Sequence, residues 1–509
     1  MDVSRVVSEG IKVWIAGGGV VLALCWSFVP RRVAVGLLTL LAAVSVGNYA
    51  RWGPNLLVSH VDTYDLVHYY LNAKYFDELG YLDLYPAVMY ADFRNGGPHF
   101  PKQGDRYMAQ DEHGHFFASV RTHGLPRGAE VAEAFGPERW AEFEHDALVL
   151  QRDFPGMNDR LWRQLIQDHG YNATPVWTMA ARPLAEAVPV ESIKWLCHLD
   201  TVLLAAAVGA VVWAYGSVAG LWTVLFFMLS YSLRWPTISW AFLRYDYLAA
   251  LVIAMACLRK NKPLLAGLLT GYSAALRFFP AMWLFGPGAK GFFGLLRKKV
   301  HVPMLVMLGG FLLGMGGLQV AATGALGSET VRTHFENMLD HNSAEQLSSR
   351  RIGLALALPF AGPFNEEPYP DYIEASRKDT IEDQKPLRFA IAGAVMLVMG
   401  FAMRHKDDDE VFAYGFVPFF LLTTASYYYY VARVTLVVLH GSRLDRWRHR
   451  IGLASIVGLE LFSNWAETAR VGERVFHIGW LSWGLCAYVA VQTLWMLAER
   501  RGEATPAGR

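Results

Sequence analysis

The sequence predicts an all-α polytopic membrane protein, a helical bundle of about 13 transmembrane segments with an outer cap formed by a long first loop. Hydrophobic residues make up 53% of the 509 residues, and charged residues make up only 18%. The apolar residues are gathered into runs, and a run of roughly 20 helical residues crosses the hydrocarbon of a bilayer. Two long polar stretches interrupt the runs and predict the parts that lie outside the membrane.

The apolar runs predict the membrane segments in chain order, at 11–29, 33–50, 197–215, 217–234, 237–258, 263–276, 278–289, 302–322, 387–404, 411–425, 427–441, 451–464 and 478–498. The runs at 263–276 and 278–289 are too short to span upright, so we expect a buried hairpin or tilted helices inside the bundle. No small-residue cleavage site follows the first run, and a second run comes at once. We therefore expect a first transmembrane hairpin at 1–50 and not a cleavable signal.

The polar stretches set the remaining boundaries. We expect a large outer loop at 51–196, a transmembrane bundle with a short hairpin at 197–322, a second outer loop at 323–386, a C-terminal transmembrane bundle at 387–498 and a disordered tail at 499–509. In the first outer loop, apolar residues recur at helical spacing in 67–80 and 157–168, which predicts short helices lying in the membrane interface. The stretch 92–128 is dense in Gly, Pro and His and predicts ordered loop or small strands.

Basic residues set the predicted orientation. Clusters on one side of this arrangement are Arg31-Arg32, Arg259-Lys260-Asn261-Lys262, Lys290 with Arg297-Lys298-Lys299, Arg404-His405-Lys406, Arg443-Arg446-Arg448-Arg450 and Arg500-Arg501. The positive-inside rule makes that side cytoplasmic. The C-terminus is then inside, the N-terminus is outside, and both large loops face away from the cytoplasm. Arg5 and Lys12 would lie outside, so if one half of the first hairpin does not span, the N-terminus moves inside.

Composition also limits which cofactors and partners we expect. The net charge of +1 indicates no strongly charged partner, and we expect no nucleic acid. The four cysteines lie in or beside apolar runs without CxxC spacing, which favours small core residues over disulfides or a zinc site. Four histidines gather in the first outer loop, but their spacing is not that of a metal site, so we expect no metal there: His99, His113, His115 and His123.

The stretch from His60 to Phe76 is the strongest candidate for function. Asp62 and Asp65 sit three residues apart at the predicted membrane surface and open an aromatic segment that includes His68 and Tyr69. Charges near lipid are costly and usually functional. Asp65 either does chemistry or caps the helix that starts near Val67, and one residue can do both. Asp62 is then a partner that tunes Asp65 or a second acid.

Basic and aromatic residues near the outer side supply further candidates. Arg277 lies between two apolar runs, where it binds an anion, forms a structural salt bridge or reaches the interface. Arg244 and Asp246 either pair with each other or line a pocket. Arg350 and Arg351 are ligand contacts or ordinary loop charges. The run from Tyr427 to Tyr430 is an aromatic belt or the wall of a binding site.

Four stretches in order along the chain resemble the GT-C glycosyltransferases, in particular bacterial mannosyltransferases that use polyprenyl-phosphate sugars. They are Asp65-Leu66-x-x-Tyr69 with Ala73, Gly80 and Leu84-Tyr85; the Gly- and Ala-rich run from Gly267 to Arg277 and Pro280; His341-Asn342-Ser343 with Arg350 and Arg351; and Thr424-Ala425-Ser426 followed by four tyrosines. The chain departs from the family at Arg244-Tyr245-Asp246-Tyr247, at Arg277 where Lys is common, and in its long first outer loop. These departures bear on the sugar and the acceptor.

The resemblance implies an enzyme, an inverting hexosyltransferase that moves a sugar, with mannose favoured, from a polyprenyl-phosphate donor to a hydroxyl of a glycolipid, glycan or protein. The expected site faces the periplasmic side of a bacterial-type inner membrane. Such a site needs a base for the acceptor hydroxyl and cations for the leaving phosphate. A divalent metal is allowed but not indicated, and no cofactor is implied. The implied catalytic residues are Asp65 and Asp62; the implied donor-phosphate ligands are Arg277, Arg244, Arg350 and Arg351; the implied substrate contacts are His60, His68, Tyr69, Asn342, Tyr427, Tyr428 and Asp246.

Two other classes fit part of the pattern. A transporter or flippase of lipid-linked glycans would also carry intramembrane Arg and Asp, but the sequence has no inverted repeat and no matched pair of broken helices. An O-antigen-type ligase or polymerase shares a large outer loop with paired arginines, which suits Arg350 and Arg351. The early Asp motif does not suit that class.

Overall fold

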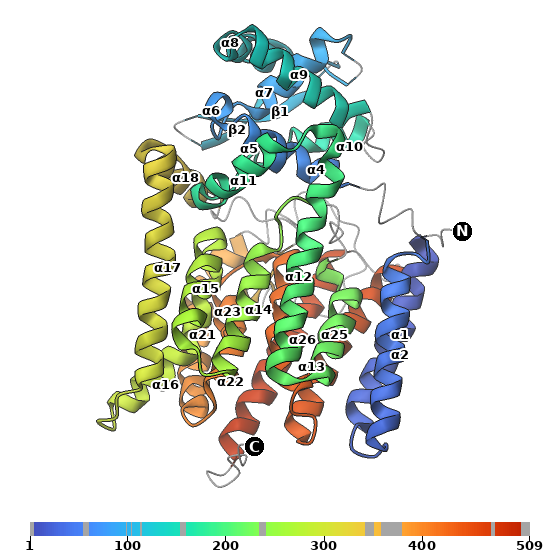
Figure 1. Cartoon of the computed structure of the whole chain (residues 1–509), viewed down its shortest axis with the longest axis vertical. Helices are drawn as coiled ribbons and strands as arrows, with labels where there is room; N and C mark the ends of the chain where they lie inside the picture. Colours follow the sequence, from blue (N-terminus) through green and yellow to red (C-terminus); the bar gives the residue numbers. More distant parts are fainter. Residues whose placement is uncertain are drawn as a thin grey trace.

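The computed structural model has two layers, a helical bundle and a cap that sits on one end of it (Figure 1). It describes residues 5–53, 61–97, 99–102, 104–111, 114–152, 159–233, 241–341, 351–357, 379–469 and 474–499. Within these ranges most residues are helical. The strands described are the hairpin β1 (Arg106–Asp111) with β2 (Gly114–Ser119) and the short pair β3 (Arg351–Ile352) with β4 (Ala425–Ser426). The expectation of an all-α membrane protein is confirmed at this level.

The cap is built from the first outer loop. Its short helices and turns are α4 (Thr63–Leu66), η1 (Val67–Leu71), α5 (Asn72–Lys74), α6 (Phe76–Leu79), α7 (Leu84–Arg94), η2 (Val120–Gly124), α8 (Leu125–Phe135), α9 (Pro137–Arg152), α10 (Asp159–Leu165), α11 (Pro175–Ala187) and η3 (Val190–Ser192). The hairpin β1–β2 lies within the expected stretch 92–128.

The bundle contains the apolar helices. They are α1 (Arg5–Cys25), α2 (Arg31–Tyr49), α12 (Ile193–Tyr215), α13 (Ser217–Leu229), η4 (Tyr231–Leu233), α14 (Asp246–Arg259), α15 (Pro263–Arg277), η5 (Phe279–Leu284), α16 (Phe285–Leu295), α17 (Val302–Leu326), α21 (Lys385–Met403), α22 (Asp408–Ala413), α23 (Phe416–Leu422), η7 (Tyr427–Arg433), α24 (Val434–Gly441), α25 (Trp447–Ala469) and α26 (Arg474–Ala498). Helix α18 (Ser328–His341) follows α17 on the cap side, and α19 (Leu354–Ala357) follows β3.

Among the described residues, six helices are long and apolar enough to cross a membrane: Val7–Cys25, Arg31–Tyr49, Val190–Tyr215, Val302–Leu326, Lys385–Met403 and Gly479–Ala498. The other expected segments correspond to shorter helices, some of them broken, as in α22 with α23 and in η7 with α24. Helix α14 is buried on most of its surface, so protein rather than lipid surrounds it. The number of thirteen spans therefore stays a prediction.

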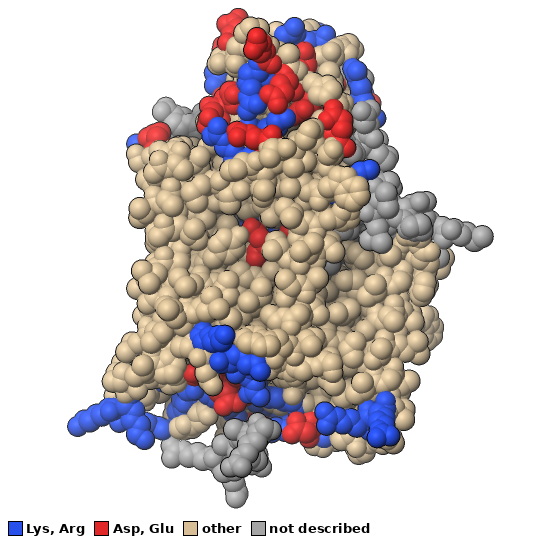
Figure 2. All heavy atoms as spheres, viewed as in Figure 1, with Lys and Arg blue, Asp and Glu red and all other residues tan. Residues whose placement is uncertain are grey.

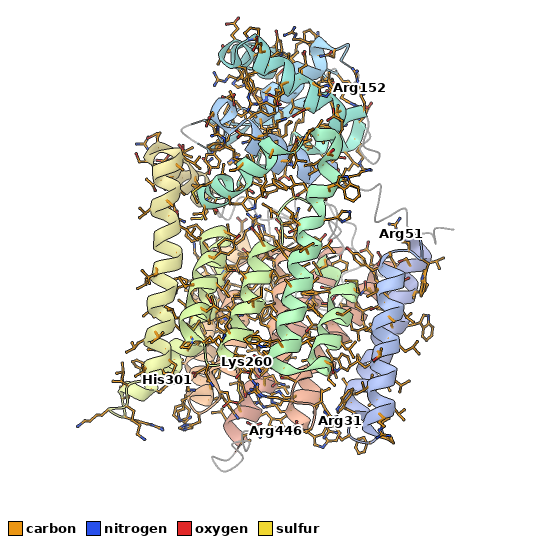
Figure 3. All side chains as sticks on the ribbon, viewed as in Figure 1. Arg31, Arg51, Arg152, Lys260, His301 and Arg446 are labelled. Carbon is orange, nitrogen blue, oxygen red and sulfur yellow. The ribbon has the colours of Figure 1, made fainter. Side chains whose placement is uncertain are left out.

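The charges of the bundle are segregated by end. Arg31, Lys260, His301 and Arg446 lie at the end opposite the cap, whereas Arg51 and Arg152 lie toward the cap (Figure 3). Figure 2 shows a wide uncharged band between these ends, with acidic atoms visible in one hollow of the band. Members of three of the predicted basic clusters, Arg31, Lys260 and Arg446, thus lie at one end of the folded bundle. Because lipid excludes charge, this band has the composition of a membrane-embedded surface.

Helix α15 packs on α17 at a distance that only glycine allows. A Cβ on Gly267 would lie 2.0 Å from the Met307 carbonyl oxygen, and one on Gly271 would lie 2.5 Å from that of Phe311. Glycines spaced by four residues let two membrane helices approach until their backbones touch. The glycine-rich run that the sequence singles out is therefore a helix-packing surface. This packing fixes the position of α15 along α17, and with it the position of the end of α15.

The cap has its own core of aromatic side chains. Tyr75 packs edge-on against Phe143, with ring centroids 5.1 Å apart, and Phe135 and Trp140 complete the cluster. In the two stretches expected as interfacial helices, most of the described large apolar side chains are buried, including Trp162, so they face the cap core and not a lipid surface. Helix α18 contacts β2 and α11. The cap is therefore held against the bundle from the α17 side.

Candidate functional site

The acid motif forms a short helix at the base of the cap. Asp62 is the residue before α4, and its carboxylate accepts the backbone N–H of Asp65 at 3.3 Å. The helix then widens into the π turn η1, which begins two residues after Asp65. Such turns are rare inside helices and are frequent at functional sites. The helix N-cap role that the sequence left open for Asp65 is therefore filled by Asp62, at the start of α4.

Asp65 is buried and forms an ion pair with Arg244. Its second oxygen accepts the backbone N–H of Phe242 at 3.3 Å. The sequence left open whether Arg244 pairs with Asp246, and the structure pairs it with Asp65, which lies 179 residues earlier. The guanidinium also lies over the ring of Tyr428, 4.8 Å from its centroid. Arg244 therefore joins the cap to the bundle.

Asp200 on α12 holds Arg244 in place through the backbone. Its two carboxylate oxygens accept the N–H groups of Arg244 and Tyr245, each at 2.9 Å. Asp200 is fully buried and was not among the predicted residues. A lone acid inside the apolar run at 197–215 was the available signal, because such acids are usually functional or positional.

Asp246 begins helix α14 and does not form an ion pair among the described residues. One oxygen accepts its neighbour Tyr247's N–H at 2.7 Å, and the other accepts the hydroxyl of Tyr272 at 3.4 Å. Both contacts keep the carboxylate against the first turn of α14, where a negative charge is favourable.

Arg277 is the last residue of α15 and lies beside a strained residue. Phe278 has φ of +28°, a left-handed conformation that is uncommon outside glycine and often marks a functional site. The guanidinium lies 5.8 Å from the centroid of the Tyr69 ring. No carboxylate of the described residues lies within 4 Å of it, so Asp246 is a neighbour and not a salt-bridge partner.

Two hollows meet at Arg277. A small cleft is lined by Tyr69, Arg244, Tyr245, Tyr247, Arg277, Tyr428 and Tyr429. A cavity of about 400 Å³ lies between the cap, α15, α18 and the β3–β4 pair. Arg277, Tyr428 and Tyr429 line both, so the cleft and the cavity share a wall. Asp62 and Asp65 are not among the described residues that line either, and Asp65 lies behind Arg244.

The cavity is aromatic and cationic. Its described lining includes Arg277, Arg351, three histidines, two asparagines and several aromatic rings, and it includes no Asp or Glu. Arg351 on β3 donates one hydrogen bond to the Thr424 carbonyl oxygen at 3.2 Å. His334 on α18 faces Tyr81 of the cap, with ring centroids 5.7 Å apart. Burial and the charge of Arg277 lower the pKa of His334 to about 4, so this histidine is neutral at physiological pH.

The acid pair is electrostatically unusual. Burial and the nearby charge of Asp65 raise the pKa of Asp62 to about 7, even though Arg244 and two backbone N–H groups act in the opposite direction. Asp62 therefore titrates near neutral pH, three residues away from a second carboxylate. Perturbed acids of this kind cluster at functional sites.

The remaining predicted residues fall in different places. His68 is buried in the cap, where its ring nitrogens contact the Tyr64 carbonyl oxygen at 2.8 Å and the Tyr85 hydroxyl at 2.7 Å. It positions the cap and is not among the described residues that line the cavity. Tyr427 is buried against Tyr231. His60, Asn342 and Arg350 lie outside the described residues. His113 of the first loop also lies outside the described residues, and no group of three metal-binding side chains occurs in the described part of the chain.

The chain matches no protein-family model, no curated protein and no solved structure. The case for its function therefore rests on the site itself.

Proposed function

We propose that the protein is an inverting GT-C-type glycosyltransferase that moves a sugar from a polyprenyl phosphate to an acceptor hydroxyl. The resemblance favours mannose as the sugar, and the acceptor is a glycolipid, a glycan or a protein. The observation that carries the proposal is the junction of cap and bundle. There Arg277, which has no carboxylate of the described residues within 4 Å, lines an aromatic cavity, and the buried Asp65 lies behind Arg244 of the adjoining cleft.

The geometry supports a direct displacement. The acceptor oxygen forms a bond to the anomeric carbon while the bond from that carbon to the phosphate oxygen breaks, and polyprenyl phosphate leaves with the electron pair. The acceptor proton passes to a carboxylate, for which Asp65 is the first candidate and Asp62 the second. One displacement inverts the anomeric centre. No nucleotide takes part, because the donor phosphate is already a good leaving group.

Arg277 and Arg244 are the proposed phosphate ligands because both line the small cleft. A guanidinium stays charged and binds two phosphate oxygens at once. Arg244 also forms an ion pair with Asp65, so this carboxylate is occupied until the arginine turns away. In this proposal Arg244 turns from Asp65 to the donor phosphate, which frees the carboxylate only when donor is present.

The proposed setting is a bacterial-type inner membrane with the cap on the periplasmic side. The basic end of the bundle supports this orientation through the positive-inside rule. Membrane lipids then surround the uncharged band, and the prenyl chain of the donor reaches the cleft from the outer leaflet. About 13 spans remain the proposed number.

An assay in detergent tests the function. Purified protein is mixed with radiolabelled mannosyl polyprenyl phosphate and an extract of membrane lipids and glycans, and new glycosidic products are counted. We expect product with the wild type and at least about 100-fold less per folded molecule with Asp65→Asn, the usual loss for a general base. A flippase would make no product in detergent and would need a sealed bilayer, so a negative result in every donor and acceptor mixture would refute the transferase.

A further inference from the structure

The cavity holds a second arginine whose charge the described residues leave uncompensated. Arg351 is only 8% exposed, and its Nε is buried without a hydrogen-bond partner. Its single hydrogen bond among the described residues goes to a neutral carbonyl, that of Thr424. Burying a guanidinium in this way costs free energy unless an anion binds it. The charge is therefore placed for a ligand.

Arg351 lines the cavity together with Arg277, but it does not line the small cleft. The small cleft that joins Arg244 to Arg277 does not include Arg351 among its described lining residues. Arg351 reaches the cavity from the β3–β4 pair, and Arg277 reaches it from the end of α15. The tyrosines at 428 and 429 lie along the wall that both arginines share.

The chemistry of the wall between the arginines suits a polar ligand. Asn172 and Asn337 line it, and so do Thr423, Thr424 and Ser426. These groups donate and accept hydrogen bonds, as a hydroxyl-rich ligand needs, and the aromatic rings offer flat faces for its apolar sides. The described lining contains no carboxylate that would repel an acidic ligand.

We propose that Arg351 forms a second anion subsite, which holds a phosphate or carboxylate group of the acceptor while Arg277 holds the donor phosphate. The acceptor is then an anionic glycolipid or glycan, and a neutral one binds poorly. The identification of this ligand as the acceptor rests on the proposed function. The claim of two separate anion subsites does not depend on it.

Binding to the full chain in neutral detergent tests the two subsites. Calorimetric titration with citronellyl phosphate, a short prenyl phosphate, fills the donor site first. The saturated protein is then titrated with inorganic phosphate, with dihexanoyl phosphatidylglycerol, or with dihexanoyl phosphatidylcholine as a zwitterionic control. We expect a second saturable event with an anion but not with phosphatidylcholine. An event with phosphatidylglycerol alone identifies a lipid phosphate, and one with both anions identifies any phosphate.

Variants of single arginines show which residue binds the ligand in each binding event. Arg351→Gln should weaken the second event roughly ten- to hundredfold and spare the first, because a hydrogen bond to a charged group is worth that much. Arg277→Gln should do the reverse. Arg332→Gln is the matched control, since Arg332 is an exposed arginine of α18 that pairs with Glu329. Arg351→Lys keeps the charge and covers the case in which Arg351→Gln does not fold.

The outcomes separate the two proposals. A single binding event lost equally in Arg277→Gln and Arg351→Gln would mean one phosphate bound by both arginines, which overturns the second subsite and leaves the transferase intact. No second event with any anion would also overturn it. If citronellyl phosphate does not bind but an anion binds through Arg351, the donor assignment fails and the anion subsite stands.

Discussion

The ion pair between Asp65 and Arg244 makes a quantitative prediction, because it joins two residues 179 positions apart across the cap and the bundle. Replacing Asp65 with Asn leaves the guanidinium beside a neutral amide. Removing one partner of a buried pair costs about 3–5 kcal/mol. The Asp65 side chain is 2% exposed and the Arg244 side chain 16% exposed, and Arg244 keeps its contact with the Tyr428 ring. We therefore expect the lower end, about 3 kcal/mol.

A double-mutant cycle measures the pair itself. Asp65→Asn, Arg244→Gln and the double variant are unfolded with denaturant in detergent, and the free energies of unfolding are compared. We expect each single variant to be destabilised and the double variant to lose less than the sum, with a coupling of about 1–3 kcal/mol. Asp77→Asn is the control, because Asp77 pairs with Arg182 at the cap surface and its side chain is 61% exposed. It should cost less than about 1 kcal/mol.

The same variants separate stability from chemistry. Turnover per folded molecule should fall at least about 100-fold in Asp65→Asn, whereas Asp77→Asn should keep the wild-type rate. A coupling energy near zero between Asp65 and Arg244 would refute the ion pair and with it the placement of the acid behind Arg244. Full turnover in a destabilised Asp65→Asn would confine Asp65 to a structural role and move the proton-acceptor role to Asp62.

Three further predictions follow from other parts of the molecule. Because the folded pKa of Asp62 is raised to about 7, the folded state holds this proton more tightly than the unfolded chain, so stability present at low pH is lost as pH rises from about 4 through 7. The Tm of Asp62→Asn should therefore change less over this pH range than the Tm of the wild type. Parallel curves of Tm against pH would count against the raised pKa. Gly271→Ala should destabilise by about 1–3 kcal/mol because its Cβ would press on a backbone carbonyl of α17, whereas Gly309→Ala, with nothing within 4 Å, should be neutral, and equal losses would contradict the close packing. In a background with the natural cysteines replaced, a cysteine at Arg152 should react with an impermeant thiol reagent added to intact cells and one at Arg31 should not; the opposite pattern would invert the topology.

Local sequence patterns were enough for several of the long helices. Apolar runs at 11–29, 33–50 and 302–322 became α1, α2 and α17, because a helix that faces lipid must satisfy its backbone internally and expose apolar side chains on most of its surface. The two runs expected to be too short to span, 263–276 and 278–289, became α15 and the pair η5–α16. Members of three basic clusters, Arg31, Lys260 and Arg446, also lie together at one end, because lipid excludes charges. These properties depend on residue type and spacing and need no knowledge of distant contacts.

The cap could be predicted only in part. Helical spacing in 67–80 and 157–168 was read correctly as apolar and helical, but the faces turned inward to a shared core. A sequence cannot distinguish a face that enters lipid from one that meets another part of the same loop, because both are lined by the same residue types.

The sequence by itself determined that this is a helical membrane protein with acids at an early polar boundary and a glycine-rich segment that ends in Arg277. Only the tertiary structure decided which charges pair. It placed Arg244 on Asp65 instead of Asp246, brought Asp200 onto the backbone N–H of Arg244, and left Arg277 and Arg351 facing one cavity whose described lining has no carboxylate. The physical reason is that ion pairing depends on distances of a few ångströms between segments far apart in the chain, and those distances are set by how closely helices such as α15 and α17 pack.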